Sequence, residues 1–345
     1  MYPTQTGAVV ISQQSGAHAQ LTVLEHSRLD PIQEFARDVL SGLTDSPRWL
    51  PCRYLYDARG SELFEQISDQ PEYYPTRAEA SILERHATDI CETTGPVTLI
   101  ELGSGTSVKT DHLLGAYTRD GQSVRYVPVD VSESALQMGA ETIVKLRPTV
   151  TVDGIVGTYQ SAFPLFRDHS PSMVIFLGST LGNFNVTESA QFFTDVSQSM
   201  SLGDYFLLGV DLVKEESVIE AAYNDRAGVT AQFTTNIFRR INRELGATVD
   251  LDQIKHVAVY NSNWRRMEIF IEFLADQQVD IEPLGKRVAI GAGERVMIEI
   301  SRKFVLEDMA THVGQHGLAV QNTYLDDDGW FGLLLMRAVG HSTGT

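Results

Sequence analysis

The sequence has little of what several classes of protein require. Only two of the 345 residues are cysteine, Cys52 and Cys91, and two separated thiols cannot build a cysteine-based metal site. The nine histidines follow no metal-ligating spacing. The longest apolar runs, such as residues 173–177, have the length of a strand and are far shorter than a membrane span. We therefore predict no metal and no membrane association.

Basic residues are also few, with 27 Lys and Arg against 45 Asp and Glu, which gives a formal charge of −18 at pH 7. An acidic excess of this size repels phosphate backbones, so we do not expect a nucleic-acid partner. With 43% hydrophobic residues the chain can bury a sizeable core. The first residues lack a basic region followed by an apolar stretch, and we expect a cytoplasmic monomer.

The middle of the chain alternates short apolar runs with amphipathic segments. Expected strands cover residues 97–100, 124–129, 151–156, 172–177 and 204–210. Strands that alternate with helices in this way indicate an α/β fold with a parallel, doubly wound sheet. We therefore predict a Rossmann-like core over residues 96–213.

The regions on either side of this core show other hydrophobic patterns. Residues 1–27 show no sustained periodicity and are predicted to be a flexible N-terminal tail. Residues 28–95 form a helical segment, with a first helix over 31–43, that joins a smaller substrate-binding domain. Residues 214–304 supply that domain, with helix over 215–245 and strands over 254–260, 264–275 and 295–304. Residues 305–345 return to the core sheet with a strand over 331–336.

The first predicted core strand leads into a glycine loop. Gly103 and Gly105 allow the backbone to approach a ligand without Cβ clashes. Asp130 ends the second strand, at a spacing close to that of the acid that binds ribose in such folds. Lys109 lies in the following helix, where it could reach a ligand carboxylate. The structural alternative is a tight turn followed by an exposed lysine.

The pattern Glu101-x-Gly103-x-Gly105 resembles the first motif of class I S-adenosylmethionine-dependent methyltransferases. More specific segments lie outside it, in the same order along residues 30–340. They are YLYDARGSELF at 54–64, EYYPTRAE at 72–79, GSTLGN at 178–183, YNDRAGVT at 223–230 and EISRKF at 299–304. Together these segments resemble the histidine-specific methyltransferase family, the histidine Nα-methyltransferases of ergothioneine biosynthesis.

The resemblance implies a Rossmann-like class I methyltransferase sheet, S-adenosyl-L-methionine as cofactor and L-histidine as substrate. It places Tyr56, Gly103, Gly105, Lys109, Asp130, Thr158 and Tyr159 at the cofactor. It places Asn183 and Tyr223 at the substrate carboxylate, Tyr73, Glu299 and Ser301 at the imidazole, and Phe64, Gly178 and Ile269 close to them. A carboxylate and a hydroxyl can serve the two nitrogens of an imidazole. The structural alternative for Glu299 and Ser301 is the solvated face of a strand.

Two positions depart from the family pattern. After the third core strand the family carries an acid for the adenine, where this chain has the uncharged Thr158 before Tyr159. Ile269 stands where the histidine enzymes typically have methionine against the imidazole, and a branched side chain reshapes that wall. The second departure bears directly on the preference for histidine.

The expected reaction is attack by the neutral α-amine of histidine on the sulfonium methyl, repeated to give the trimethyl betaine hercynine. We assign no general base, because positioning and exclusion of water suffice. Three alternatives stay open at this point. They are the same reaction on tryptophan or a derivative, a non-catalytic S-adenosylmethionine-binding regulator, and a nicotinamide oxidoreductase, which the incomplete glycine fingerprint disfavours.

Overall fold

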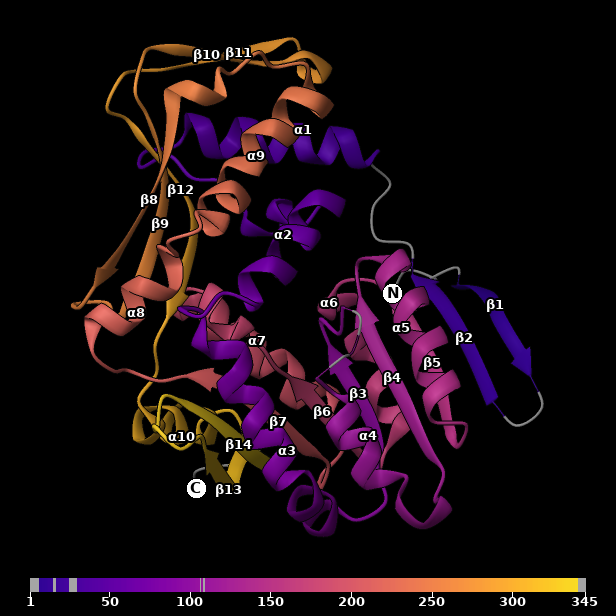
Figure 1. Ribbon diagram of the computed structural model, residues 1–345. Helices are drawn as coiled ribbons and strands as arrows, with labels where there is room; N and C mark the ends of the chain where they lie inside the picture. The colour runs from indigo at the N-terminus through magenta and orange to yellow at the C-terminus, as the bar shows by residue number, and fades with distance from the viewer. Residues whose placement is uncertain (1–5, 15–16, 25–29, 106, 108, 341–345) are drawn as a thin grey trace, which may run out of the picture.

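A computed structural model describes residues 6–14, 17–24, 30–105, 107 and 109–340 of the chain. It divides into a large sheet with helices on both faces and a smaller lobe above it (Figure 1). No helix in the described ranges is both long and apolar enough to cross a membrane.

Among the described residues, nine strands form the large sheet. In spatial order they are β1 (Thr6–Gln14), β2 (Ala17–Leu24), β5 (Val150–Val156), β4 (Val124–Asp130), β3 (Thr98–Leu102), β6 (Ser172–Phe176), β7 (Tyr205–Asp211), β14 (Phe331–Ala338) and β13 (Leu318–Leu325). Strands β5, β4, β3, β6 and β7 run parallel, and β14 is antiparallel to both of its neighbours. The chain order reverses at β3, and ligands bind at such a point in open α/β sheets. The predicted α/β class and parallel sheet are confirmed.

Helices cover both faces of this sheet, and apolar side chains fill the two layers between. One face carries α3 (Tyr74–Thr94), α4 (Asp111–Tyr117) and α5 (Glu133–Leu146). The other carries α6 (Tyr159–Ala162), the 3-10 turn η3 (Phe163–His169), α7 (Val186–Ser199) and α10 (Leu306–Gly314). The core strands are consequently buried on both sides, which explains why they are continuous apolar runs in the sequence.

The smaller lobe has its own hydrophobic core. A three-stranded antiparallel sheet contains β8 (Ile254–Asn261), β9 (Arg266–Phe273) and β12 (Arg295–Arg302), and a separate hairpin contains β10 (Gln277–Ile281) and β11 (Lys286–Ile290). Helices α1 (Pro31–Thr44), α2 (Ala58–Ser68), α8 (Glu216–Tyr223) and α9 (Val229–Leu245) pack against them. Short 3-10 turns η1 (Cys52–Leu55), η2 (Arg119–Gly121), η4 (Thr180–Asn183), η5 (Leu251–Gln253) and η6 (Glu282–Leu284) connect elements of both parts.

Of the predicted flexible tail over residues 1–27, residues 1–5, 15–16 and 25–27 lie outside the described residues, and residues 6–14 and 17–24 form strands instead. Strands β1 and β2 form a hairpin, and β2 pairs in parallel with β5 from His18 to Val23. Leu21 is buried in this position, and a Cβ on Gly154 would lie 2.3 Å from its Cδ2 atom, so the glycine makes room for the added strand. The hairpin therefore extends the sheet beyond its conventional edge strand β5.

Two further boundaries are corrected by the packing. The predicted helical segment 28–95 is divided, because α1 and α2 pack in the smaller lobe whereas α3 packs on the core sheet. The predicted helix over 215–245 is two helices, α8 and α9, separated at Asn224–Gly228, where Gly228 has a φ of 70°. The return of the C-terminal residues to the core sheet through β14 agrees with the prediction.

The two parts meet where η4, after β6, lies on the backbone of β12. A Cβ on Gly182 would lie 3.0 Å from the Arg302 backbone oxygen and 3.2 Å from its nitrogen. Phe304 donates its backbone N–H to the Asp211 oxygen at 2.8 Å, which ties the residues after β12 to the end of β7. This junction brings one strand of the small lobe to the carboxyl ends of the core strands.

We predict that Gly182→Ala lowers the thermal midpoint by about 2–6 °C, because the added methyl must displace the β12 backbone and overpacking costs about 1–3 kcal/mol. Calorimetric melting measures it. Gly314→Ala is the matched control, because a Cβ there meets nothing within 4 Å and neither glycine has a positive φ. Equal midpoints for the two variants would contradict the close approach.

Candidate active site

The loop after β3 has the conformation that its glycines predict. Gly103 has a φ of 66° and donates its N–H to the Val129 oxygen at 2.8 Å. A Cβ at this position would lie 2.7 Å from the Tyr159 hydroxyl. Gly105 has a φ of 51° and nothing within 4 Å of a Cβ position, so the backbone there is open to a ligand.

Asp130, at the end of β4, holds two loops with one carboxylate. Its Oδ2 atom accepts the Gly105 N–H at 2.9 Å, and its Oδ1 atom accepts the Ser132 N–H at 2.9 Å. Each carboxylate oxygen can accept a further hydrogen bond. The carboxylate is therefore fixed in orientation and keeps acceptor capacity for the two hydroxyls of a ribose.

The residues after β5 complete the same edge. Thr158 is exposed and caps α6 by accepting the Ser161 N–H at 3.3 Å. The Tyr159 ring packs on Phe176 and Phe192, with centroid separations of 5.5 and 6.4 Å. Gly103, Gly105, Asp130, Thr158 and Tyr159 are thus brought together at the carboxyl ends of β3, β4 and β5.

Glu101 belongs to the interior of this loop. Its buried carboxylate accepts hydrogen bonds from the Thr110 hydroxyl at 2.6 Å and from the Tyr126 hydroxyl. Burial raises the pKa of Glu101 to about 7, against these hydrogen bonds, which lower it. Tyr126 also lies 2.7 Å from the Ser107 hydroxyl. Glu101 therefore anchors the loop to β4 and to the segment before α4.

Lys109 lies in the turn before α4, not in the helix as predicted, and it has a partner that the sequence did not indicate. Its ammonium pairs with Glu79 of α3, a carboxylate with no exposed surface, and the lysine side chain is 30% exposed. The other Glu79 oxygen accepts the Gly178 N–H at 2.7 Å, and Gly178 has a φ of 76°. A Cβ on Gly209 would lie 2.2 Å from that oxygen. The only available signal was an acid within the apolar face of α3.

The β12 strand presents two of the predicted substrate residues on one face. Glu299 and Ser301 are two positions apart, so both side chains project to the same side. Ile269 of β9 pairs directly with Glu299 and is buried beside it. The Asn183 side chain, which comes from η4 after β6, lies close enough to the Glu299 carboxyl group to lower its pKa. Residues from core and lobe therefore meet at Glu299.

Glu299 is held in an environment that disfavours its charge. Burial raises its pKa to about 7, while the Lys303 charge and the Asn183 hydrogen bond act in the opposite direction. A carboxylate in this state gains from any ligand N–H that it can accept. Asn183 keeps one of its two amide protons for another acceptor.

Behind Ser301 lies a buried network of charged groups. Lys303 donates to Tyr223 at 2.8 Å, to Ser301 at 2.9 Å and to Asp211 at 2.8 Å. Tyr223 donates its own proton to Ser301 at 2.7 Å. Lys214 also pairs with Asp211, and burial lowers the pKa of Lys214 to about 8. Two ammonium groups thus share one carboxylate. The Tyr223 proton, predicted to bind a substrate carboxylate, is already donated to Ser301.

Aromatic side chains enclose the remaining side. The Tyr56 ring lies 5.6 Å from Phe64 and 5.4 Å from Phe233, and Tyr73 lies 6.3 Å from both Phe64 and Tyr223. Tyr56 is 41% exposed. The structure therefore groups Tyr56 with the predicted substrate residues, although the sequence analysis assigned it to the cofactor.

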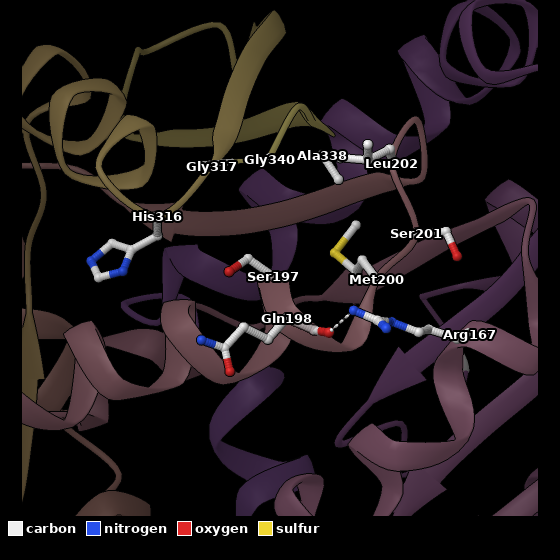
Figure 2. Close-up of a pocket in the computed structure, with 10 residues that line it drawn as sticks. All are labelled: Arg167, Ser197, Gln198, Met200, Ser201, Leu202, His316, Gly317, Ala338 and Gly340. Atoms are coloured by element: carbon white, nitrogen blue, oxygen red, sulfur yellow. Dashed lines mark hydrogen bonds between the residues drawn. The ribbon is translucent and has the colours of Figure 1, made fainter. Parts of the chain in front are cut away.

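A hollow of about 550 Å³ lies elsewhere in the molecule (Figure 2). It is formed in part by Met200 and Leu202, which precede β7, whereas Gly103, Asp130 and Thr158 lie at or after the carboxyl ends of their strands. The Arg167 guanidinium in it donates to the Gln198 oxygen at 2.7 Å. The hollow contains none of the predicted site residues.

Comparisons with known proteins identify the family to which the chain belongs. Residues 35–338 match the family described as histidine-specific methyltransferase, SAM-dependent. The chain is 40% identical over 300 residues to a histidine N-alpha-methyltransferase of Mycolicibacterium smegmatis, covering 87% of this chain and 93% of that protein. The chain belongs to this family.

Two less similar proteins also match the chain. Ergothioneine biosynthesis protein 1 of Neurospora crassa is 31% identical over 272 residues, which are 76% of this chain and 30% of that protein. An L-tryptophan methyltransferase of Psilocybe serbica is 27% identical over 334 residues, covering 87% of this chain and 92% of that protein.

The sheet edge fits the cofactor of this methyltransferase family. When bound, S-adenosylmethionine supplies an electrophilic methyl group on a sulfonium. Asp130 offers acceptors suited to a ribose diol, and the open backbone at Gly105 allows close approach. The Lys109 ammonium lies between the β3 and β6 ends and suits a ligand carboxylate, with Glu79 fixing its position. Thr158 offers a neutral hydroxyl beside the Tyr159 ring.

Asp130→Asn tests the cofactor edge. An amide cannot accept from both the Gly105 and Ser132 N–H groups and remain an acceptor for two ribose hydroxyls. We predict about 10- to 100-fold weaker binding of S-adenosylhomocysteine, measured by titration calorimetry. Asp153→Asn, on β5 and paired with Arg125, is the control and retains its affinity. Unchanged binding in Asp130→Asn would refute the ribose assignment.

Proposed function

We propose that this methyltransferase transfers methyl groups to the α-amine of L-histidine and repeats the reaction to give the betaine hercynine, a step of ergothioneine biosynthesis. The observation that carries the proposal is the meeting of Asn183 from the core with Glu299 and Ser301 from β12. Family membership and the 40% identical histidine N-alpha-methyltransferase support it independently.

The imidazole lies against β12 in this proposal. The Glu299 carboxylate accepts the ring N–H, and the Ser301 hydroxyl serves the other nitrogen. The two residues stand about 7 Å apart along the strand. Ile269 forms the wall beside Glu299, because the strand register sets the two side chains next to each other. Phe64, Tyr73 and Tyr56 exclude water from the ring.

The substrate carboxylate lies toward the core. The second amide proton of Asn183 can bind it, and Gly178 leaves space near Lys109. The Lys303 ammonium lies 2.8 Å from the Tyr223 hydroxyl, and its positive charge favours an anion on that side of the site. Tyr223 contributes its position in that network and its ring, since its proton is engaged with Ser301.

The α-amine attacks in its neutral form, so the site must favour loss of its proton. An α-amino group has a pKa of about 8 in peptides, and nearby positive charge lowers it further. The buried Lys303 and Lys214 supply such a charge. No general base is required, because the proton can leave through water before transfer. The chain's contribution is orientation of the amine and exclusion of competing water.

The direct test uses the purified protein with S-adenosylmethionine and each of the twenty amino acids in turn. Mass spectrometry is expected to show one, two and three added methyl groups on histidine, with the trimethylated species accumulating. Tryptophan is the informative competitor, given the relative named for it. Modification of tryptophan in preference to histidine would overturn the proposed substrate, and cofactor binding with no product would indicate a non-catalytic regulator.

Glu299→Gln is expected to weaken recognition and stabilise the fold together. A neutral amide accepts hydrogen bonds less strongly than a carboxylate, so the histidine KM rises by about tenfold or more. Folding raises the pKa of Glu299 from 4.5 to about 7, so the protonated side chain is the form that the folded state favours. The contribution of Glu299 to the free energy of unfolding is therefore fully present below pH 4.5 and is lost as the pH rises to 7. The variant's thermal midpoint should therefore exceed the parent's by about 2 °C or more at pH 8.

The same pair of proteins at pH 5.5 provides the control for this effect. At pH 5.5 the loss of stability caused by Glu299 is only partly developed, because this pH lies between the unfolded pKa of 4.5 and the folded pKa of about 7. Most of the folded Glu299 is still protonated there and resembles the neutral glutamine. The difference in midpoint is expected to shrink accordingly. A variant with an unchanged KM and no gain in midpoint at pH 8 would remove Glu299 from the buried substrate site.

A further inference from the structure

The Lys303 ammonium, whose side chain has no exposed surface, has no spare donor. It has three N–H groups and three acceptors within reach, namely Tyr223 at 2.8 Å, Ser301 at 2.9 Å and Asp211 at 2.8 Å. An ammonium only donates, so Tyr223 and Ser301 must each receive one of these bonds on oxygen. The direction of both hydrogen bonds is therefore fixed by the charge of Lys303.

The hydrogen bonds donated by Lys303 limit what the Ser301 hydroxyl can still bind. Its oxygen accepts from Lys303 and also from Tyr223, at 2.7 Å. A hydroxyl oxygen has two acceptor positions, and both are now used. Its remaining capacity is its own proton, which has no acceptor among the described residues. The buried Ser301 hydroxyl is consequently a donor toward a ligand and cannot act as an acceptor.

We propose that Lys303 is a positioning residue that makes Ser301 an obligate donor to the substrate ring, so that the pocket selects a ring with one N–H and one unprotonated nitrogen. The proposal rests on the proposed function for the identity of the substrate. Glu299, two residues earlier on the same face of β12, supplies the complementary acceptor.

The pair of Glu299 and Ser301 then distinguishes rings by their hydrogen-bonding pattern. A neutral imidazole has one donor and one acceptor nitrogen and satisfies both residues. An imidazolium has two donors, and an indole has one donor and no acceptor, so each leaves the Ser301 proton opposite a group that cannot accept it. A buried donor without a partner is costly, and sites built on such a donor discriminate strongly.

A purely structural role for Lys303 is disfavoured by its neighbour. Lys214 already pairs with Asp211, and it also donates to the Tyr74 hydroxyl and the Leu212 oxygen, both at 2.7 Å. Asp211 therefore retains a cationic partner without Lys303. Among the described residues, Lys214 donates to Asp211, Tyr74 and Leu212 and to neither Ser301 nor Tyr223. The two lysines therefore separate neutralisation of Asp211 from orientation of Ser301.

The test compares histidine with its two pyrrolylalanine analogues, which keep a ring N–H in either position and replace the acceptor nitrogen by CH. The readout is the ratio of kcat/KM for histidine to that for the better analogue. The parent enzyme is expected to prefer histidine by about 100-fold or more. Lys303→Met frees an acceptor position on Ser301, and the ratio is expected to fall by about tenfold.

Three variants make the result specific. Lys214→Met perturbs the same carboxylate and should leave the ratio unchanged. In a Ser301→Ala background the change at Lys303 should have no further effect on the ratio, because the two residues act as a unit. Tyr223→Phe empties the other acceptor position of Ser301 and should lower the ratio as well. It also tests the proposal if Lys303→Met fails to fold, which binding of S-adenosylhomocysteine reports.

The outcomes separate the two proposals. Failure of the parent enzyme to methylate histidine overturns the proposed function. A parent that methylates histidine but accepts the pyrrole analogues equally well overturns the role of Ser301 as an obligate donor. A ratio unchanged in both Lys303→Met and Tyr223→Phe, with activity on both substrates lowered in parallel, shows that Lys303 is a structural ion-pair residue only.

Discussion

The contact between the end of β7 and the end of β12 is the constraint on which the site depends. Asp211 and Lys303 form a buried ion pair there, with 1% and 0% of their side chains exposed. The Phe304 N–H also donates to the backbone oxygen of Asp211. The ion pair and the backbone hydrogen bond together hold the end of β12 against the end of β7. It places β12 across the carboxyl ends of the core strands, where Asn183 reaches Glu299.

In the proposed function, recognition is divided between two frames, the core sheet and the small lobe. The core sheet orients the nucleoside side through Asp130, whose two oxygens are fixed by the N–H groups of separate loops. The small lobe supplies the ring of the substrate with an acceptor and a hydroxyl from one strand, which is a more exact support than a loop. Glu79 and Lys109 lie between them, under the loop at Gly178. The amine to be methylated therefore lies at the boundary of the two frames.

The sequence predicted the elements whose structure depends on neighbouring residues. The five parallel core strands are apolar because helices cover both faces, and Gly103 requires its positive φ, so both were visible in the sequence. The β1–β2 hairpin was not, because its place depends on pairing with β5, more than 100 residues away. The burial of Lys303 and Asp211 could not be predicted for the same reason. Charged residues are ordinarily exposed, and these two are buried only because β12 packs against the end of β7.

Some site residues could likewise be predicted from the sequence, and others depend on partners that are distant along the chain. The family resemblance selected Glu299, Ser301 and Asn183, and the structure brings them together. Tyr56, predicted at the cofactor, packs against Phe64. Glu79 was overlooked because an acid within a helix is ordinarily solvated. These residues could only be assigned once their partners were known, since a hydrogen bond is a property of two groups.

Nitrogen-15 NMR of ring-labelled histidine bound with S-adenosylhomocysteine at pH 8 tests the central claim most directly. If Glu299 accepts and Ser301 donates, the bound imidazole is a single tautomer, with one protonated nitrogen and one hydrogen-bonded acceptor nitrogen at distinct, unaveraged shifts. Averaged shifts like those of free histidine, or two protonated nitrogens, would contradict the account.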